Sequence, residues 1–458
     1  MIMGLIIKYR FHLLIFLLSF LVLTRFNIDG DLGWHIAYGR EFLRSGVIIA
    51  NDPFSWTIKG HFWANSYFFY QILVAWLFEN AGYLATVILF GVISAAPVVL
   101  LLPKKLNKLA PFAVLVGVLM ASASLGIKPH TFDFLFYAIL LFLIERKLYK
   151  NFKLVPFWFL FFAIWANFHV GFLIGLFAFS GFVVLDLLKR KKFPGYESAL
   201  LLAVAWLGTL ATPFNFQIWK AIFFDSTSPL GLLYVYEWQP IIYSLKFTLL
   251  FVLSGLIFLY IFRKKYQKID PEWFLLGTVL FMLPFISTFY LIFWAEYFIF
   301  ITSRYFDIKT DLSKILITLI LVVLVLGAII NFGKQLTKSK TLNERFMADG
   351  YPVEAMNYIV SHGYTDQLFN HFNWGGFIDW QYPNVTVFID GRMNGWRQDD
   401  GRYIFDEFIQ IVRGKCDSFS RYDPKVALVT KGSSEKCFSG WRTVYSDSIS
   451  KVLVKQNE

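Results

Sequence analysis

Charged residues are scarce in this chain. They make up 16% of its 458 residues, while 57% are hydrophobic and 20% are aromatic. A soluble globular protein is usually about 25% charged and about 45–50% apolar. A disordered chain and a soluble enzyme are therefore excluded. The chain also has only two cysteines, which excludes a small scaffold held together by disulfides.

Several cofactor motifs are missing as well. The sequence has no Walker loop, no dinucleotide-binding glycine fingerprint, no H-E-x-x-H and no haem attachment motif. Without a nucleotide-binding loop, ATP-driven transport is not expected. Without an N-terminal cytosolic α/β domain, a nucleotide-sugar donor from the cytoplasm is not expected either. An enzyme with an outward-facing site needs a donor that is already outside, and a lipid-linked phosphate sugar meets that need.

The net charge of +12 comes from short basic clusters that separate long apolar runs. This distribution is typical of cytoplasmic loops, so nucleic acid is not an expected partner. A bilayer-spanning helix needs about 20 apolar residues. Twelve segments approach this length: 11–27, 66–80, 83–102, 111–126, 132–148, 155–168, 171–188, 198–214, 244–262, 272–287, 288–304 and 312–331.

The charge pattern decides how many of the twelve segments cross. If all twelve did, most basic clusters would lie on the side opposite to Lys8 and Arg10, against the usual cytoplasmic excess of Lys and Arg. Segment 66–80 is short and carries Gln71 and Glu79, so we interpret it as an interfacial helix. With about eleven transmembrane helices, the clusters at 104–108, 146–153, 189–192, 263–268 and 304–314 all become cytoplasmic.

The sequence therefore predicts a polytopic α-helical protein of a bacterial plasma (inner) membrane, with the bilayer as its surroundings and a cytoplasmic N-terminus. Residues 1–28 form the first span, 29–82 an outer loop with interfacial helices, and 83–331 the remaining spans. Residues 340–458 lack a spanning run and predict a small extracytoplasmic α/β domain. Its expected elements are a helix at Tyr351–His362 and strands at Val385–Ile389, Val426–Thr430 and Lys451–Val454.

Both cysteines, Cys416 and Cys437, fall in this C-terminal domain. In an extracytoplasmic location they could form a disulfide, and two free thiols are the alternative.

The acidic segment Asp29-Gly30-Asp31 directly follows the first span, and His35 comes four residues after Asp31. Glycine lets the backbone turn so that both carboxylates face one ligand. Such a pair could hold a divalent cation, or one carboxylate could deprotonate an acceptor hydroxyl. The plain alternative is a solvated turn at a helix end. We take Asp31, Asp29 and His35 as candidate catalytic residues.

Further polar residues collect on the same predicted outer face, and ionisable groups at a membrane edge are often functional. Lys128 and His130 could clamp a phosphate, unless the lysine only snorkels to the interface. Asn167 and His169 could bind substrate or form a polar hairpin. Glu237 and Trp238 could bind a sugar, or Trp238 could belong to the aromatic belt. These six are candidate substrate-binding residues.

Together these motifs resemble a family. The chain is similar to bacterial membrane glycosyltransferases of the C-type (GT-C) superfamily, with the protein O-mannosyltransferases, the lipid A aminoarabinose transferases and the rhizobial-type galacturonosyltransferase branch. The similarity covers most of the chain in order. It is carried by Asp31, Trp34-His35, Gly39, Asn51-Asp52-Pro53-Phe54-Ser55, Trp63-Ala64-Asn65, Lys128-Pro129-His130, residues 165–171, Pro213-Phe214-Asn215, Glu237-Trp238, residues 369–376 and residues 387–392.

The resemblance implies an inverting glycosyltransferase that uses a polyprenyl-phosphate sugar and an acceptor hydroxyl on a glycan, lipid or protein. Asp31 would be the base, or, in metal-dependent relatives, a ligand of Mg²⁺ or Mn²⁺ with Asp29. Lys128 and His130 would face the donor phosphate. Relatives often carry an arginine between the ninth and tenth spans, but the stretch 287–296 has none. No role follows for the C-terminal motif around Asn373 and Asp390-Gly391-Arg392, although Asp390 and Arg392 could pair.

Two alternatives remain from the sequence. A transporter or flippase for a lipid-linked sugar would need a path to the cytoplasm, and we find neither paired broken helices nor a charged residue deep within a span. A catalytically inactive scaffold of the cell envelope would explain the missing arginine, but not the acidic motif.

Overall fold

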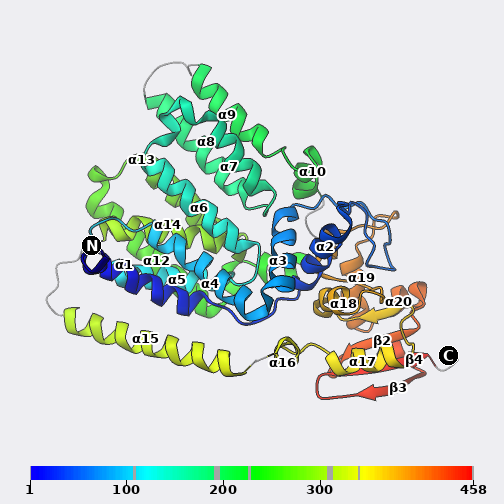
Figure 1. The fold of residues 1–458 in the computed structure, drawn as a ribbon. Helices are drawn as coiled ribbons and strands as arrows, with labels where there is room; N and C mark the ends of the chain where they lie inside the picture. Colours follow the sequence, from blue (N-terminus) through cyan, green and yellow to red (C-terminus); the bar gives the residue numbers. More distant parts are fainter. Residues whose placement is uncertain are drawn as a thin grey trace. The chain divides into compact units, whose positions relative to one another are not determined.

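The computed structural model describes residues 2–106, 110–189, 196–224, 228–306, 313–338 and 341–455 (Figure 1). Of the basic clusters, Lys108, residues 190–192 and Lys309 lie outside the described residues. The chain divides into two compact units. Unit 1 comprises residues 1–26, 84–212 and 236–337, and unit 2 comprises residues 27–83, 213–235 and 338–458.

Each of the twelve apolar segments contains a helix, and eleven of these helices belong to unit 1. They are α1 (Ile2–Leu23), α4 (Gly82–Leu100), α5 (Ala110–Ala121), α6 (His130–Glu145), α7 (Val155–Ala166), α8 (Phe172–Lys189), α9 (Tyr196–Gly208), α12 (Leu245–Lys265), α13 (Pro271–Met282), α14 (Leu291–Tyr305) and α15 (Ser313–Lys338). Among the described residues, three stretches are long and apolar enough to cross a membrane: Gly82–Leu100, Phe172–Lys189 and Leu245–Lys268. The eleven-span topology stays a prediction.

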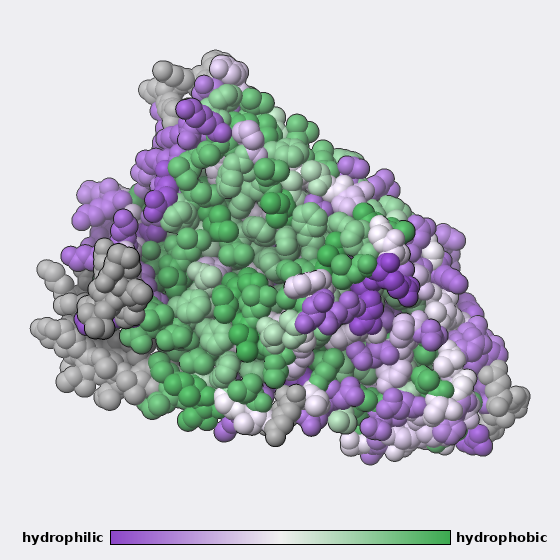
Figure 2. Space-filling view, viewed as in Figure 1, coloured by the Kyte–Doolittle hydropathy of each residue, from purple (hydrophilic) through white to green (hydrophobic). Residues whose placement is uncertain are grey.

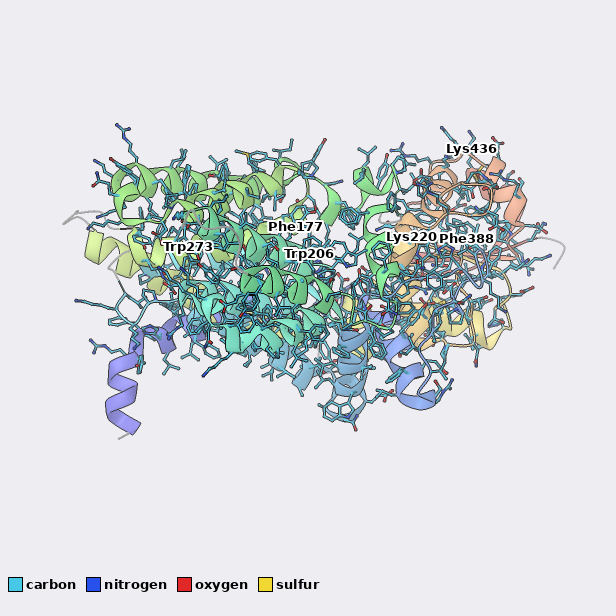
Figure 3. All side chains as sticks on the ribbon, turned by 90° about the horizontal axis from the view of Figure 1, so that it is seen from above. Phe177, Trp206, Lys220, Trp273, Phe388 and Lys436 are labelled. Carbon is cyan, nitrogen blue, oxygen red and sulfur yellow. A yellow bond between two sulfur atoms is a disulfide. The ribbon has the colours of Figure 1, made fainter. Side chains whose placement is uncertain are left out.

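Unit 1 is built around α14, in which every residue from Leu291 to Ser303 is buried. A helix that is apolar on all sides needs neighbours on all sides, and α14 packs against α5, α6, α12 and α13. Close approach to α5 depends on Gly117, where a Cβ atom would lie 2.4 Å from Ile299. On the face seen in Figure 2, hydrophobic residues gather over the helices of unit 1. Figure 3 labels one aromatic contact within it, Phe177 of α8 against Trp206 of α9, with ring centroids 5.7 Å apart.

Ion pairs join one set of helix ends in unit 1. Lys189 at the end of α8 binds Glu272 of α13 at 2.5 Å, and Arg304 at the end of α14 binds Glu145 of α6 at 2.6 Å. Lys150 pairs with Asp186 at 2.7 Å. Four of the five basic clusters thus have members at helix ends, the exception being 104–108. Three of the four clusters take part in ion pairs between helices. These are the helix ends that the sequence predicts to be cytoplasmic.

Unit 2 combines segments that are far apart in the sequence. It contains α2 (Leu32–Ser45), α3 (Phe68–Asn80), α10 (Phe216–Phe224), α11 (Gly231–Tyr234), α16 (Leu342–Ala348), α17 (Val353–Ser361), α18 (Gly375–Gln381), α19 (Ile404–Val412) and α20 (Asp417–Tyr422). Its sheet has the order β1-β2-β4-β3, with β1 (Leu368–Asn370), β2 (Val426–Thr430), β3 (Trp441–Ser446) and β4 (Ser450–Lys455). Strand β1 is parallel to β2, and the other two pairings are antiparallel.

The outer loop and the C-terminal residues, which the sequence analysis treated as separate stretches, form this unit together. The Ile28 amide donates to Asp349 at 2.7 Å, and the Trp56 indole donates to the Leu368 carbonyl at 3.1 Å. Helix α3, the segment 66–80 interpreted as interfacial, packs on α2. Its buried Gln71 accepts a hydrogen bond from Asn65 at 2.6 Å. This contact gives the Gln71 side-chain oxygen a partner inside unit 2.

The predicted elements of the C-terminal region agree with the structure except in one case. The helix at 351–362 is α17, and the strands at 426–430 and 451–454 are β2 and part of β4. The prediction of a strand at Val385–Ile389 was wrong. Only isolated bridges occur there, at Val387, because its amides bond elsewhere: Val387 donates to the Phe54 carbonyl, and Phe388 donates to the Asn370 side chain at 2.7 Å.

Cys416 and Cys437 form a disulfide in unit 2, with Cα atoms 5.1 Å apart. The bond closes a loop with a sequence separation of 21. For a loop of this size the chain-entropy model gives a stabilisation of about 3 kcal/mol. We therefore expect Cys416→Ser/Cys437→Ser to lower the free energy of unfolding of unit 2 by roughly that amount, measured as an earlier thermal transition. Reductant should shift the wild type and leave the variant unchanged; equal shifts would contradict the pairing.

Candidate functional site

Lys128 and Glu237, both candidate residues, meet in unit 1 although 109 positions separate them. The Lys128 ammonium lies 2.5 Å from Glu237 Oε1. His130 Nε2, at the start of α6, lies 3.9 Å from the other Glu237 oxygen. The lysine was expected to face a donor phosphate, and here its charge is balanced by a carboxylate. Glu237 therefore holds the cation in place and also competes with any anion for it.

A second pair of side chains, Asp133 of α6 and His169, lies next to the first pair. Asp133 is fully buried, accepts a hydrogen bond from the Trp165 indole at 2.8 Å, and contacts Nδ1 of His169. The His169 and His130 rings lie 4.6 Å apart between centroids. Gly171 makes room for the acid, since a Cβ atom there would lie 2.2 Å from the Asp133 carboxyl carbon. We call Lys128, Glu237, His130, His169 and Asp133 the unit 1 polar cluster.

The Asn167 side chain bonds to backbone carbonyl groups of unit 1. Its amide nitrogen donates to the Ala163 carbonyl at 2.8 Å and to the Ala211 carbonyl at 2.9 Å. The amide group thus caps α7 and joins it to the segment that follows α9. This agrees with the polar-hairpin interpretation, and substrate binding by Asn167 stays a prediction. Trp238 is half-buried beside Glu237 in a short 3₁₀ turn. Sugar stacking and an interfacial position both stay predictions for it.

One statement made from the sequence was wrong. Glu296 lies within α14, in the middle of the predicted span 288–304, and its side chain is fully buried. Neither of its carboxyl oxygens has a hydrogen-bond partner among the described residues. A charged residue therefore does occur deep within a predicted span. The sequence argument against a transporter loses this support, because buried acids of this kind often mark ion or substrate pathways.

The acidic turn in unit 2 directly precedes α2. Asp29 Oδ1 accepts the backbone amide of Asp31 at 3.1 Å. Asp31 Oδ1 accepts the indole N–H of Trp34 at 3.1 Å. Both carboxylates are partly exposed. The two acids thus differ in their contacts. Asp29 stabilises the turn through the Asp31 amide, and the Asp31 carboxylate is oriented by Trp34 at the start of α2.

His35, the third candidate catalytic residue, is buried among aromatic rings. The residue is 2% exposed. Its ring centroid lies 3.5 Å from that of Trp34, 4.9 Å from that of Tyr67 and 4.7 Å from that of Tyr70. The structure thus shows a packing role for His35, and its catalytic role stays a prediction. Two of these rings, Tyr67 and Tyr70, are more than 30 positions away in the sequence.

Glycines let the C-terminal residues approach the acidic turn closely. A Cβ atom at Gly33 would lie 1.9 Å from the carbonyl oxygen of Gly376, and one at Gly376 would lie 2.4 Å from that of Gly30. Helix α18 therefore packs directly on the first turn of α2. The motif around Asn373, which had no role from the sequence, provides this support.

The Asp390-Gly391-Arg392 motif is held by a buried ion network. Arg392 donates to Asp52 at 2.7 Å, to Tyr38 at 2.6 Å and, through Nε, to Asp390 at 2.8 Å. Burial raises the pKa of Asp52, but the charge of Arg392 and hydrogen bonds from Ser55 and Arg392 outweigh it and leave the pKa below its ordinary value. The expected pairing of Asp390 with Arg392 is confirmed. Arg392 cannot replace the arginine missing between the ninth and tenth spans, because its side chain is enclosed.

A third acid lies against this network. Asp379 of α18 is fully enclosed, and burial together with the neighbouring Asp390 raises its pKa well above the ordinary value. Its protonated form is thus favoured relative to that of a free aspartate. The network itself has two carboxylates and one guanidinium, and Asp379 lies beside it.

Arg392→Ala should destabilise unit 2 strongly. Removing one partner of a buried ion pair leaves the remaining charges uncompensated and costs about 3–5 kcal/mol. We expect a large fall in the free energy of unfolding, measured by chemical denaturation in detergent. Arg397→Ala is the matched control, since Arg397 is exposed and its side chain contacts the neighbouring Tyr403. Similar stability of the two variants would show that the network contributes little.

The described residues contain no group of three or more His, Cys, Asp or Glu side chains placed to hold a metal ion. Asp29 and Asp31 provide two carboxylates, and Mg²⁺ is often bound by one or two carboxylates completed by substrate phosphates and water. The pair is thus compatible with Mg²⁺ or Mn²⁺ only if a bound donor supplies further ligands.

No model of a known protein family matches the chain, and no curated protein sequence matches it either. Among solved structures, it is similar to the archaeal oligosaccharyltransferase AglB from Archaeoglobus fulgidus, determined in complex with an inhibitory peptide and a dolichol-phosphate. The TM-score is 0.54 at 11% identity, over 93% of this chain and 70% of that one. The two proteins share a fold. The bacterial branch suggested by the sequence motifs stays a prediction.

Proposed function

We propose that the chain is a membrane glycosyltransferase that moves a sugar from a polyprenyl-phosphate donor to an acceptor hydroxyl. The observation that carries the proposal is the oriented, partly exposed Asp31 carboxylate in a chain with an oligosaccharyltransferase fold. The dolichol-phosphate bound to AglB supports a lipid-phosphate donor. The donor sugar and the acceptor, whether glycan, lipid or protein, are unassigned.

The proposed step is a single displacement with inversion. Asp31 takes the proton of the acceptor hydroxyl, and that oxygen forms a bond to the anomeric carbon. The bond from this carbon to the phosphate oxygen breaks, and its electron pair leaves with the polyprenyl phosphate. A positioned base contributes about 10²–10⁴-fold to rate, so stabilising the leaving phosphate must provide much of the remaining acceleration.

The unit 1 polar cluster is the proposed phosphate site. Glu237 balances the charge of Lys128, and Asp133 contacts His169. His130 lies beside both pairs, 3.9 Å from Glu237 and with its ring centroid 4.6 Å from that of His169. Phosphate binding would displace Glu237 from Lys128, or share the ammonium with it. The bacterial inner membrane, with the reaction on its extracytoplasmic face, fits the disulfide in unit 2.

A transporter or flippase for the same lipid-linked sugar is the second candidate, and the buried Glu296 is the observation that favours it. The test uses full-length protein in liposomes with donors labelled on the sugar, at fixed Mg²⁺ or Mn²⁺ and with chelator, plus a crude envelope extract as acceptor. A transferase moves label from lipid to acceptor and releases polyprenyl phosphate. A flippase moves intact labelled lipid between leaflets. If the protein neither transfers the label nor moves the lipid with any donor, the proposal is rejected and an inactive scaffold remains.

A further inference from the structure

The unexplained Asp-Gly-Arg motif lies directly against the proposed base. A Cβ atom built on Gly391 would lie 1.6 Å from Asp31 Oδ1, 2.7 Å from its carboxyl carbon and 3.2 Å from the Trp34 indole nitrogen. The carboxylate therefore occupies the space that any side chain at position 391 would need. Gly391 is not among the described glycines with a left-handed backbone. The close approach, and not the backbone conformation, requires glycine here.

Both sides of this contact are fixed. Gly391 stands between Asp390 and Arg392, whose side chains are anchored in the buried ion network. Asp31 is held from the other direction by the Trp34 indole, which is itself packed edge-on against Trp63 with centroids 5.5 Å apart. The Asp31 carboxylate is thus confined between an indole N–H and a backbone surface.

We infer that Gly391 is a positioning residue that sets the placement of the Asp31 carboxylate for proton abstraction. The inference rests on the proposed function. In Gly391→Ala the added methyl group would meet the end of a short side chain, which can rotate away. The backbone of residue 391 is held by its neighbours, so the displacement falls on Asp31. A misplacement of about 1 Å in a catalytic group can reduce the rate about 10²-fold.

The experiment compares three glycine variants of the full-length protein in liposomes. Gly391→Ala should lower kcat for sugar transfer by about 10- to 100-fold, with little change in Tm and an unchanged KM for the donor. Gly432→Ala is the control, because a Cβ atom there meets nothing within 4 Å, and it should behave as wild type. Gly376→Ala meets the backbone carbonyl of Gly30, so it should lower Tm instead.

A double variant tests whether Gly391 acts through Asp31. If it does, Asp31→Asn/Gly391→Ala should be no slower than Asp31→Asn alone, because residues that act as one unit are not additive. If the rate losses of the two single variants multiply in the double variant, Gly391→Ala has a general structural effect and the inference is overturned. If Gly391→Ala does not fold, Trp34→Phe removes the indole N–H from the other side of the carboxylate, and it should also lower kcat at constant KM.

The outcomes separate the two proposals. Transfer by wild type that is lost in Asp31→Asn but kept at full rate in folded Gly391→Ala rejects the positioning role alone. An unchanged rate in folded Trp34→Phe would do the same where the glycine variant cannot be purified. Absence of transfer by wild type with every donor rejects the proposed function and this inference together.

Discussion

Asp31→Asn is expected to reduce sugar transfer by about 10²–10⁴-fold, the contribution of one positioned general base. Asparagine has nearly the same shape and keeps an oxygen that can accept the Trp34 N–H, but it cannot take a proton at neutral pH. Folding and donor binding should therefore be retained. The rate is measured as label transferred from the polyprenyl-phosphate donor, with donor binding measured separately on the same preparation.

Two other aspartates serve as comparisons. Asp29→Asn keeps the oxygen that accepts the Asp31 amide, so a small effect would leave Asp29 a turn-forming residue, and a loss as large as that of Asp31→Asn would make it a partner in the chemistry. Asp399→Asn changes an exposed acid of unit 2 and should leave the rate unchanged. Full activity of Asp31→Asn would remove the base from the mechanism.

Opposite changes in donor affinity are expected from the two sides of the Lys128–Glu237 pair. Lys128→Met removes a charged hydrogen-bond donor, and such a bond is worth about 1.5–3 kcal/mol. The Kd for a polyprenyl-phosphate sugar should rise about 10- to 150-fold at that free energy. Glu237→Gln frees the ammonium from its competing carboxylate, so the Kd should fall. Both values come from equilibrium binding in liposomes.

Lys246→Met is the control for this pair, because Lys246 is an exposed lysine of the same unit, in the first turn of α12. It tests whether any loss of cationic charge weakens binding of an anionic lipid. A similar rise in Kd for both lysine variants would point to general electrostatics. A rise in Kd for Glu237→Gln would mean that this carboxylate binds the donor directly, as the sequence alone had allowed.

Helix positions could be predicted because each apolar run is long enough to require burial of its backbone groups, and every such run contains a helix. The strand prediction at Val385–Ile389 failed for a physical reason. A short buried apolar run needs its amides satisfied, and here Asn370 and the outer loop satisfy them in place of a neighbouring strand. Such distant partners leave no trace in the local pattern of residues.

The candidate site was predictable by residue type but not by pairing. Lys128, His130 and His169 were selected as polar groups at span ends, and the structure brings them to one cluster. The carboxylate that neutralises Lys128 lies 109 positions away, and charge patterns have no such range. His35 was selected because it lies one helical turn after Asp31, but its surroundings include Tyr67, which precedes α3, and Tyr70 of α3. This packing could not be read from the local spacing.

Transfer by wild-type protein and by Asp31→Asn, reconstituted in liposomes with a panel of polyprenyl-phosphate sugars, tests the central claim most directly. The protein should release polyprenyl phosphate and glycosylate the acceptor with at least one donor, and Asp31→Asn should bind that donor without turning it over. Equal turnover by both proteins would contradict the role of Asp31. Intact labelled lipid appearing in the opposite leaflet, with no release of polyprenyl phosphate, would contradict a transferase altogether.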